Sequence, residues 1–190
     1  MTPRPKSWVL GVDPGFGNTG TVLRLDKGDT VVGEACWRND YTDQWEVLRA
    51  MSICIPMMET VIGWIEENDI RVLEVCLENP IYNGNARTLM VQMALYTLIQ
   101  AYIYDYLQPH LDELYLTFVN NKTSKRRMTG DGNADKEKMI ASSPWAGSDL
   151  TYSQKHTLAD SYAHSLAAGD RTLALHKMQQ YAVEANHEGP

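Results

Sequence analysis

The order of the expected elements predicts an α/β fold built on a mixed sheet. Three short strand-like runs come first and are joined by short turns, which predicts an antiparallel three-strand meander. The spacing of apolar residues then changes, and helix, strand, helix, strand and helix follow one another. With 190 residues, 44% of them hydrophobic, the chain suffices for one well-filled domain. We expect that domain over residues 1–184 and a frayed tail over 185–190.

The meander occupies the first part of the chain. An apolar run at residues 8–10 leads into GVDPGFGNTG, residues 11–20, which places Asp13 at the end of a buried strand before a tight glycine turn. Residues 21–25 alternate as a second strand, and Lys-Gly-Asp at 27–29 predicts a hairpin turn. Residues 30–37 then form the returning strand.

The helical periodicity begins after the meander. Apolar residues at helical spacing predict a helix from Asp43 to about Asn68, with Asp43 and Glu46 as a capping box. Pro56 inside this pattern should kink or split the helix. A compact apolar strand follows at residues 71–77 and ends in Glu78.

The second half alternates in the same way. A helix over residues 86–107 is apolar on nearly every side, which is typical of a helix buried between layers or against another subunit. Residues 114–119 form a strand. The basic segment NNKTSKRRMTGDGNADKEK follows, in which we expect a helix to begin at Ala134, and a last helix starts near Ser153.

The bulk properties limit the class of protein. Polar residues interrupt the longest apolar stretches, so no transmembrane span is expected, and MTPRPKS lacks an apolar signal core. We therefore expect an intracellular protein, in the cytoplasm of a bacterial or phage-infected cell. Cys36, Cys54 and Cys76 fit neither a zinc spacing nor a disulfide framework and are expected to be buried, reduced thiols. The net charge of −7 argues against a general nucleic-acid coat, although local patches decide binding.

Acids occupy the ends of two predicted strands. If the strands that end in Asp13 and Glu78 are neighbours, both carboxylates lie at one edge of the sheet, where open α/β folds place ligands. Asp160 on the last helix could pack across that edge. Three converging carboxylates repel one another unless a cation balances them, and hard oxygen ligands of this kind suit Mg²⁺ or Mn²⁺. The acids thus predict a metal centre.

Simpler interpretations exist for each acid alone. An Asp before a glycine turn is commonly a turn-former, and Glu78 before Asn-Pro can simply close a strand. The pattern around Asp13 also opens the phosphate loop of sugar kinases and actin-like ATPases, but those proteins need a second glycine loop and a duplicated domain. The chain of 190 residues has no room for either.

The last helix carries a polar stripe among apolar residues. His156, Asp160 and His164 follow one another at intervals of four and therefore share one helix face. An isolated pair of this kind would suit a solvated surface. The flanking residues are mostly apolar, which indicates that Asp160 has a specific role.

Four blocks of sequence, in order, resemble the RuvC family of Holliday-junction resolvases, whose fold is ribonuclease H-like. They are GVDPGFGNTG, LENPIYNGNARTL, KRRMTGDGNADKEKM and HTLADSYAHSLAAG, and together they span the chain from Val9 to about Gly169. The resemblance implies a mixed five-stranded sheet flanked by helices. It also implies a homodimer that nicks two symmetry-related strands of a four-way DNA junction, for which the apolar helix from Ala86 would face the partner.

The resemblance assigns roles to individual residues. Asp13, Glu78 and Asp160 correspond to the catalytic acids that bind metal, with two Mg²⁺ ions expected per site and Mn²⁺ able to substitute. Lys125 and Lys136 fall on basic positions that contact phosphates. The basic segment could be a solvated surface loop, but four cations within six residues repel one another without a partner, which favours phosphate contacts. The cations expected to contact the DNA backbone are Lys122, Lys125, Arg126, Arg127 and Lys136.

Two positions depart from the family pattern. The family carries Asp or His three residues before the final Asp, where this chain has Thr157; His156 lies one residue earlier and is the expected catalytic helper. The loop after the Glu often carries an aromatic wedge, at a place taken here by Ile81 with Tyr82 next. These two residues and Asn85, from the matching Asn-Ala pair, are expected to contact DNA.

The sequence therefore predicts a metal-dependent endonuclease that cleaves four-way junctions and leaves 5′-phosphate and 3′-hydroxyl ends. The enzymatic alternative is a ribonuclease H-like nuclease acting on RNA–DNA hybrid or on other branched or flap DNA. The non-enzymatic alternative is a junction-binding module without catalysis, against which the three intact acids argue.

Overall fold

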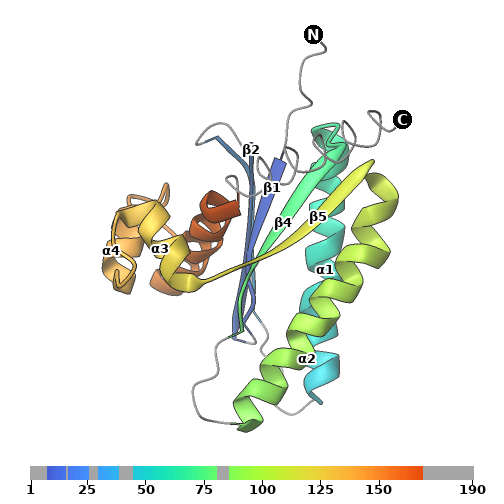
Figure 1. Cartoon of the computed structure of the whole chain (residues 1–190), viewed down its shortest axis with the longest axis horizontal. Coiled ribbons are helices and arrows are strands. Elements are labelled where there is room, and N and C mark those ends of the chain that lie inside the picture. Colours follow the sequence, from blue (N-terminus) through green and yellow to red (C-terminus); the bar gives the residue numbers. More distant parts are fainter. Residues whose placement is uncertain (1–7, 16, 26–29, 39–44, 81–85, 169–190) are drawn as a thin grey trace, which may run out of the picture.

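A five-stranded mixed sheet forms the centre of the molecule (Figure 1). The computed structural model describes residues 8–15, 17–25, 30–38, 45–80 and 86–168, with only the backbone of 86–88. The strand order is β3-β2-β1-β4-β5, in which β1, β2 and β3 pair antiparallel and β4 pairs parallel with β1 and with β5. The predicted mixed sheet with its meander is confirmed. The strands are β1 (Trp8–Asp13), β2 (Asn18–Leu25), β3 (Val31–Arg38), β4 (Val72–Glu78) and β5 (Glu113–Val119).

Helices cover both faces of this sheet (Figure 1). One face carries α1 (Glu46–Glu67) and α2 (Ala86–Tyr102), the latter continued by a π-helical turn, η1 (Ile103–Leu107), and a short 3₁₀ turn, η2 (Gln108–His110). The other face carries the helical residues 152–168, beside which lie α3 (Asn121–Thr129) and α4 (Lys136–Ala141).

The central strand β1 contributes to a core on each face. Leu10 and Val12 belong to the large core formed with α1 and α2. Val9 points the opposite way and packs with Cys76 and Ala167. A strand buried on both faces reads as a continuous apolar run, which is why the period-2 signal is weak in β1 and β4. Because side chains alternate, Asp13 lies on the same face as Val9, the face covered by residues 152–168.

The start of α1 differs from the prediction. The helix begins at Glu46, with Trp45 as an N-cap residue that makes no side-chain cap hydrogen bond. The expected capping box is therefore wrong in register, since Glu46 is the first helical residue rather than the third; Asp43 lies outside the described residues. Pro56 does not split the helix, which continues over 22 residues. The expected hairpin turn at 27–29 also lies outside the described residues.

The basic segment forms a helix that the sequence analysis did not predict. Asn120 caps α3 by accepting a hydrogen bond from the backbone N–H of Lys122 at 2.9 Å, and Gly130 ends the helix in the left-handed conformation, with φ of 78°. Both signals are typical helix boundaries. The next helix, α4, begins at Lys136 after the cap residue Asp135, two residues later than expected.

Helix α1 is the one described helix that is long and apolar enough to cross a membrane by length and composition. Its buried residues, such as Ile53, Met57 and Val61, belong to the large core against the sheet. A core helix of this kind meets the same two criteria. Cys36, Cys54 and Cys76 form no disulfide within the described residues; the last two are buried, as predicted, whereas Cys36 is only partly buried.

Candidate metal centre

Two acids meet where the neighbouring strands β1 and β4 end. The parallel register pairs Val12 with Leu77, so that Asp13 and Glu78 come next to each other, one at each strand end. Glu78 lies two residues after Cys76 and shares its face of the sheet. Both carboxylates therefore lie at one edge of the sheet, on the side of residues 152–168, as the sequence predicts.

Two glycines allow the last helix to approach that edge. A Cβ atom added to Gly11 would lie 1.9 Å from the backbone oxygen of Ser161, and one added to Gly20 would lie 2.6 Å from Cγ2 of Thr157. The helix backbone thus rests directly on β1 and β2. Asp160 lies in this contact region with only 9% of its surface exposed, and its charge raises the pKa of Asp13. The prediction that Asp160 packs across the edge is consistent with this position.

The three carboxyl groups disturb one another's ionisation. Burial raises the pKa of Asp13 well above its ordinary value, and the neighbouring charges of Asp160 and Glu78 raise it further. Burial followed by the charge of Glu78 raises the pKa of Asp160 to about 7. Burial also raises the pKa of Glu78, against the hydrogen bond from Asn121 and the charge of Lys125. Without a bound cation, the site holds protons at neutral pH.

The histidines of the last helix lie on either side of Asp160. Nε2 of His156 lies 3.2 Å from Oδ2 of Asp160. Burial, with smaller contributions from Lys136 and Lys125, lowers the pKa of His156 to about 4. This imidazole is therefore neutral at pH 7, and it contacts the acid as a neutral ring rather than as a cation. The predicted helper residue thus lies beside Asp160.

His164 was not assigned a role from the sequence. A ring nitrogen of this residue and one oxygen each of Asp13 and Glu78 all lie within 4.8 Å of one another, a grouping that could hold a metal ion. The only signal in the sequence was the spacing of four from Asp160, which places His164 on the same helix face. A spacing alone does not reveal which strand ends the face meets.

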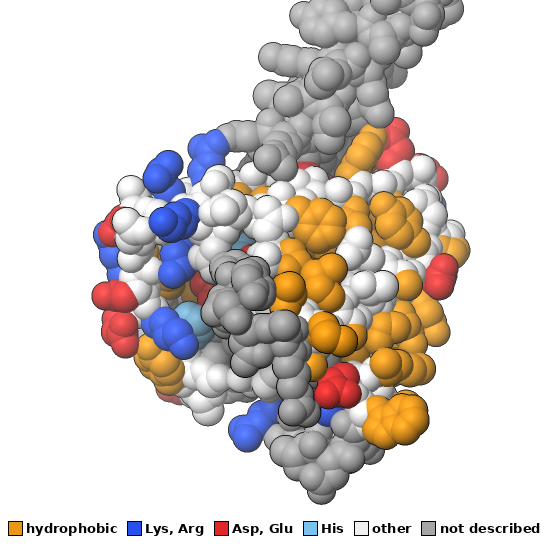
Figure 2. Space-filling view, turned by 60° about the horizontal axis from the view of Figure 1, so that its bottom comes forward, with side chains coloured by type: hydrophobic (Ala, Val, Ile, Leu, Met, Phe, Trp, Pro, Cys, Tyr) orange, Lys and Arg blue, Asp and Glu red, His pale blue; other side chains and the backbone are white. Residues whose placement is uncertain are grey.

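Most of the predicted basic residues lie on α3 and α4 at the surface. Lys122, Arg126, Arg127 and Lys136 are exposed, and Lys125 is half-buried and donates a hydrogen bond to the carbonyl of Ala134 at 2.8 Å. The charges of Lys125 and Lys136 lower the pKa of Asp160, so both act close to the acids. Figure 2 shows Lys and Arg side chains gathered on one side of the molecule, next to His and acidic surface.

Two hydrogen bonds attach α3 to the acidic site. The side-chain amide of Asn121 donates to Oε1 of Glu78. The hydroxyl of Ser124 lies 2.9 Å from Nδ1 of His164. The basic helix is thereby fixed to the group of possible metal ligands at two points.

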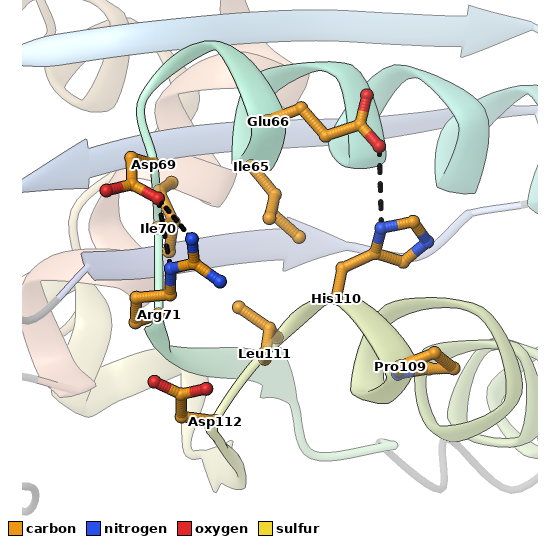
Figure 3. A pocket seen from close by; sticks show the side chains of 9 residues that line it. All are labelled: Ile65, Glu66, Asp69, Ile70, Arg71, Pro109, His110, Leu111 and Asp112. Atoms are coloured by element: carbon orange, nitrogen blue, oxygen red, sulfur yellow. Dashed lines mark hydrogen bonds and ion pairs between the residues drawn. The ribbon is translucent and has the colours of Figure 1, made fainter.

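A pocket elsewhere on the molecule contains none of the predicted site residues (Figure 3). It lies where β4 and β5 begin, at the opposite end of these strands from Glu78. Arg71 pairs there with Asp69 at 2.7 Å, and His110 faces Glu66 at 3.5 Å. Four of its polar side chains are thus already in contact in pairs. Ile81, Tyr82 and Asn85, predicted to contact DNA, lie outside the described residues.

The architecture is similar to that of solved Holliday-junction resolvases. The RuvC structure of Thermus thermophilus has 14% sequence identity and a TM-score of 0.62, covering 88% of this chain and 96% of that one. The fold is that of RuvC. The same bacterial RuvC in complex with Holliday junction substrate aligns with a TM-score of 0.62 and 14% identity, over 84% of this chain and 91% of that one.

A third solved structure, the yeast mitochondrial Holliday junction resolvase Ydc2, has a TM-score of 0.61 at 14% identity; the match covers 96% of this chain and 86% of that one. The predicted ribonuclease H-like fold is confirmed by these matches. No protein-family model and no curated protein sequence matches the chain. At such low identity the RuvC comparison establishes the fold, and the chemistry must be argued from the residues of this chain.

These residues fit a divalent cation. Three mutually repelling carboxyl groups lie at one edge of the RuvC fold, beside a ring nitrogen with no described hydrogen-bond partner. Carboxylate oxygens and a neutral imidazole are ligands for divalent metals. A bound cation would remove the repulsion that otherwise raises the pKa values of the acids.

In the metal-free protein, we expect the free energy of unfolding to fall as the pH rises from about 7 to about 8. The pKa of Asp160 is about 7, above the ordinary 3.8, so the folded protein keeps a proton that the unfolded chain has released. Raising the pH therefore favours unfolding until Asp160 ionises, and Asp13 acts in the same direction. His156 and His164 act in the opposite direction, because the unfolded imidazoles, with an ordinary pKa of 6.5, still bind some protons at about pH 7; this offset is nearly gone by about pH 7.5. Thermal melts in EDTA across these pH values measure the slope.

The Asp160→Asn variant serves as the control for this slope, because it removes the group that titrates. Its melting temperature should depend less on pH than that of the unaltered protein. An unchanged slope in the variant would show that the acids do not titrate as the site geometry predicts.

Proposed function

We propose that the protein is a metal-dependent endonuclease that resolves four-way DNA junctions. The observation that carries this proposal is the meeting of Asp13, Glu78 and Asp160 at one edge of a RuvC-like sheet, with the basic helix α3 attached to the same edge. Neither feature alone would indicate a nuclease. Together they provide ligands for a divalent cation and positive charge for the phosphates around a scissile bond.

The acids have the role of metal ligands in this proposal. Two Mg²⁺ ions, with Mn²⁺ able to substitute, would activate water and stabilise the leaving oxygen, giving a 5′-phosphate and a 3′-hydroxyl. Asp13, Glu78 and Asp160 would hold these ions. His156 is a catalytic helper whose neutral ring orients Asp160 through their 3.2 Å contact.

The basic residues would hold the DNA backbone next to the acids. Lys122, Arg126, Arg127 and Lys136 are exposed and can reach phosphates. Lys125 contributes its charge from a fixed position on Ala134. Contacts of this type position the DNA and carry little sequence information. Contacts by Ile81, Tyr82 and Asn85 with unstacked bases at the junction stay a prediction.

A homodimer would supply the two active sites that paired cleavage needs. Helix α2 and the turn η1 carry several exposed hydrophobic side chains on the face of the sheet opposite the acids: Met90, Met93, Tyr104 and Tyr106. Figure 2 shows hydrophobic side chains spread over much of one side of the molecule. Apolar residues on all sides of α2 suit contact with a second copy of the chain.

The names of the similar structures support the choice of substrate. One is RuvC bound to a Holliday junction, and another is a mitochondrial Holliday junction resolvase. The cytoplasmic location expected from the sequence stays a prediction.

The decisive test offers the protein several DNA structures side by side in Mg²⁺. We expect symmetrical paired cuts in a four-way junction and little cleavage of RNA–DNA hybrid, flap or linear duplex. Preferential cleavage of hybrid or flap would assign the protein to another ribonuclease H-like activity. Tight junction binding without any cleavage, in Mg²⁺ or Mn²⁺, would instead identify a binding module.

A further inference from the structure

His164 has an unusual environment for a core histidine. Its side chain is 1% exposed, and it lies on the last helix facing the ends of β1 and β4. Nδ1 contacts Ser124, whereas Nε2 has no hydrogen-bond partner among the described residues. A buried polar atom without a partner is costly, so an unpaired ring nitrogen next to two carboxyl groups requires a physical reason.

The hydrogen bonds of Ser124 indicate which ring nitrogen carries the proton. Its hydroxyl points toward the backbone oxygen of Asn120 at 3.5 Å, which uses its single proton. The same oxygen can then accept a hydrogen bond from Nδ1–H of His164 at 2.9 Å. In that tautomer Nε2 carries a lone pair. A second residue that fixes the tautomer in this way is typical of histidines that bind metals.

The lone pair and the neighbouring carboxylates repel one another unless a cation lies between them. A ring nitrogen of His164 and an oxygen each of Asp13 and Glu78 lie within 4.8 Å of one another, the spacing of ligands around a single ion. A divalent metal shared by the three groups turns the repulsion into attraction. Lys125 and Lys136 cannot take this place, since Lys125 donates to Ala134 and Lys136 is exposed.

We propose that Nε2 of His164 is a direct metal ligand together with Asp13 and Glu78, and that Ser124 is the positioning residue that orients it. The proposal rests on the proposed function in placing a catalytic ion at this edge. The inference adds a nitrogen ligand to the site, and a nitrogen ligand changes which divalent ion the site binds more tightly. Mg²⁺ favours oxygen ligands, whereas imidazole suits transition ions, so the site should select Mn²⁺ over Mg²⁺ more strongly than an all-carboxylate site would.

Pulsed electron paramagnetic resonance of the Mn²⁺-loaded protein tests the ligand directly. We expect ¹⁴N modulation from a directly coordinated imidazole, present in the unaltered protein and in H156Q and absent from His164→Gln. Calorimetric titration should show that His164→Gln weakens Mn²⁺ binding by more than about tenfold and changes Mg²⁺ binding less. Nitrogen modulation retained in His164→Gln, or equal losses for both ions, would overturn the proposal.

Ser124→Ala tests the positioning role without removing the ligand. The nitrogen modulation should persist, while Mn²⁺ affinity falls by about tenfold, the low end for loss of a partner that orients a metal ligand. Ser143→Ala is the matched control, because it removes a buried hydroxyl whose described bonds are local: it donates to the carbonyl of Ile140 and accepts from the backbone N–H of Trp145. Unchanged Mn²⁺ affinity in Ser124→Ala would show that the contact does not orient His164.

These measurements need no DNA and are separate from the test of the proposed function. If the unaltered protein cuts no junction but binds Mn²⁺ through nitrogen, the metal site stands and the resolvase activity fails. If it cuts junctions with Mn²⁺ bound by oxygen alone, the activity stands and the role of His164 fails. Circular dichroism of each variant verifies that the fold is retained.

Discussion

Asp13→Asn is expected to abolish cleavage of a four-way junction and to leave junction binding intact. Asp13 lies at the centre of the acidic site, where its pKa is raised by burial and by both other acids. An amide cannot supply the negative charge that balances a divalent cation. Cleavage should fall by more than about 100-fold, the upper figure for loss of a group that merely supports a metal ligand. Single-turnover assays and gel-shift titrations on the same junction measure the two effects.

The same substitution should stabilise the metal-free protein, because it removes one of three repelling acids from a buried place. A higher melting temperature in EDTA, together with lost cleavage, would show that the acids are arranged for an ion rather than for stability. Asp149→Asn is the control. Asp149 is exposed and lies in the connection between α4 and the last helix. An Asp13→Asn variant that still cuts at a near-normal rate in Mg²⁺ would contradict the assignment.

Gly11→Ala is expected to prevent the last helix from packing on the sheet. The new methyl group would lie 1.9 Å from the backbone oxygen of Ser161 and 2.8 Å from the backbone nitrogen of Ser165, and neither atom can move without the helix. The loss of stability should exceed about 3 kcal/mol, the upper end for ordinary overpacking of a core. Chemical denaturation measures this loss.

The control for this substitution is Gly17→Ala, because a Cβ atom there meets nothing within 4 Å. Its stability should change little. If Gly11→Ala remained as stable as this control, the close contact between β1 and the helix would be wrong, and with it the placement of Asp160. Metal binding should also be weakened in Gly11→Ala, because Asp160 and His164 lie on the displaced helix. It should be unchanged in Gly17→Ala.

The sequence predicted the parts of the fold that depend on local pattern. The strand ends at Asp13 and Glu78 follow from apolar runs closed by an acid, and both were placed correctly. Their adjacency could only be assumed, because the pairing of β1 with β4 joins segments some sixty residues apart. The parallel register then brought the two acids together.

The features that were missed depend on contacts between distant segments or on signals given too little weight. The contact of His164 with Ser124 joins residues 40 positions apart, and no local pattern encodes it. Helix α3 did have local signals, with Asn120 as a cap and Gly130 at its end. They were overlooked because the segment was interpreted from its charge, four cations within six residues, and not from its helix boundaries.

The candidate ligands are scattered along the chain. Asp13 lies near the beginning of the described part, Glu78 lies 65 residues later, and His164 lies close to its end. During synthesis on the ribosome, the first two can meet as soon as β4 has paired with β1, but the last helix must still emerge and settle on Gly11 and Gly20. A nascent or prematurely ended chain therefore carries no complete set of ligands. The metal site is in this way completed only after residues 152–168 have been synthesised and have packed on the sheet.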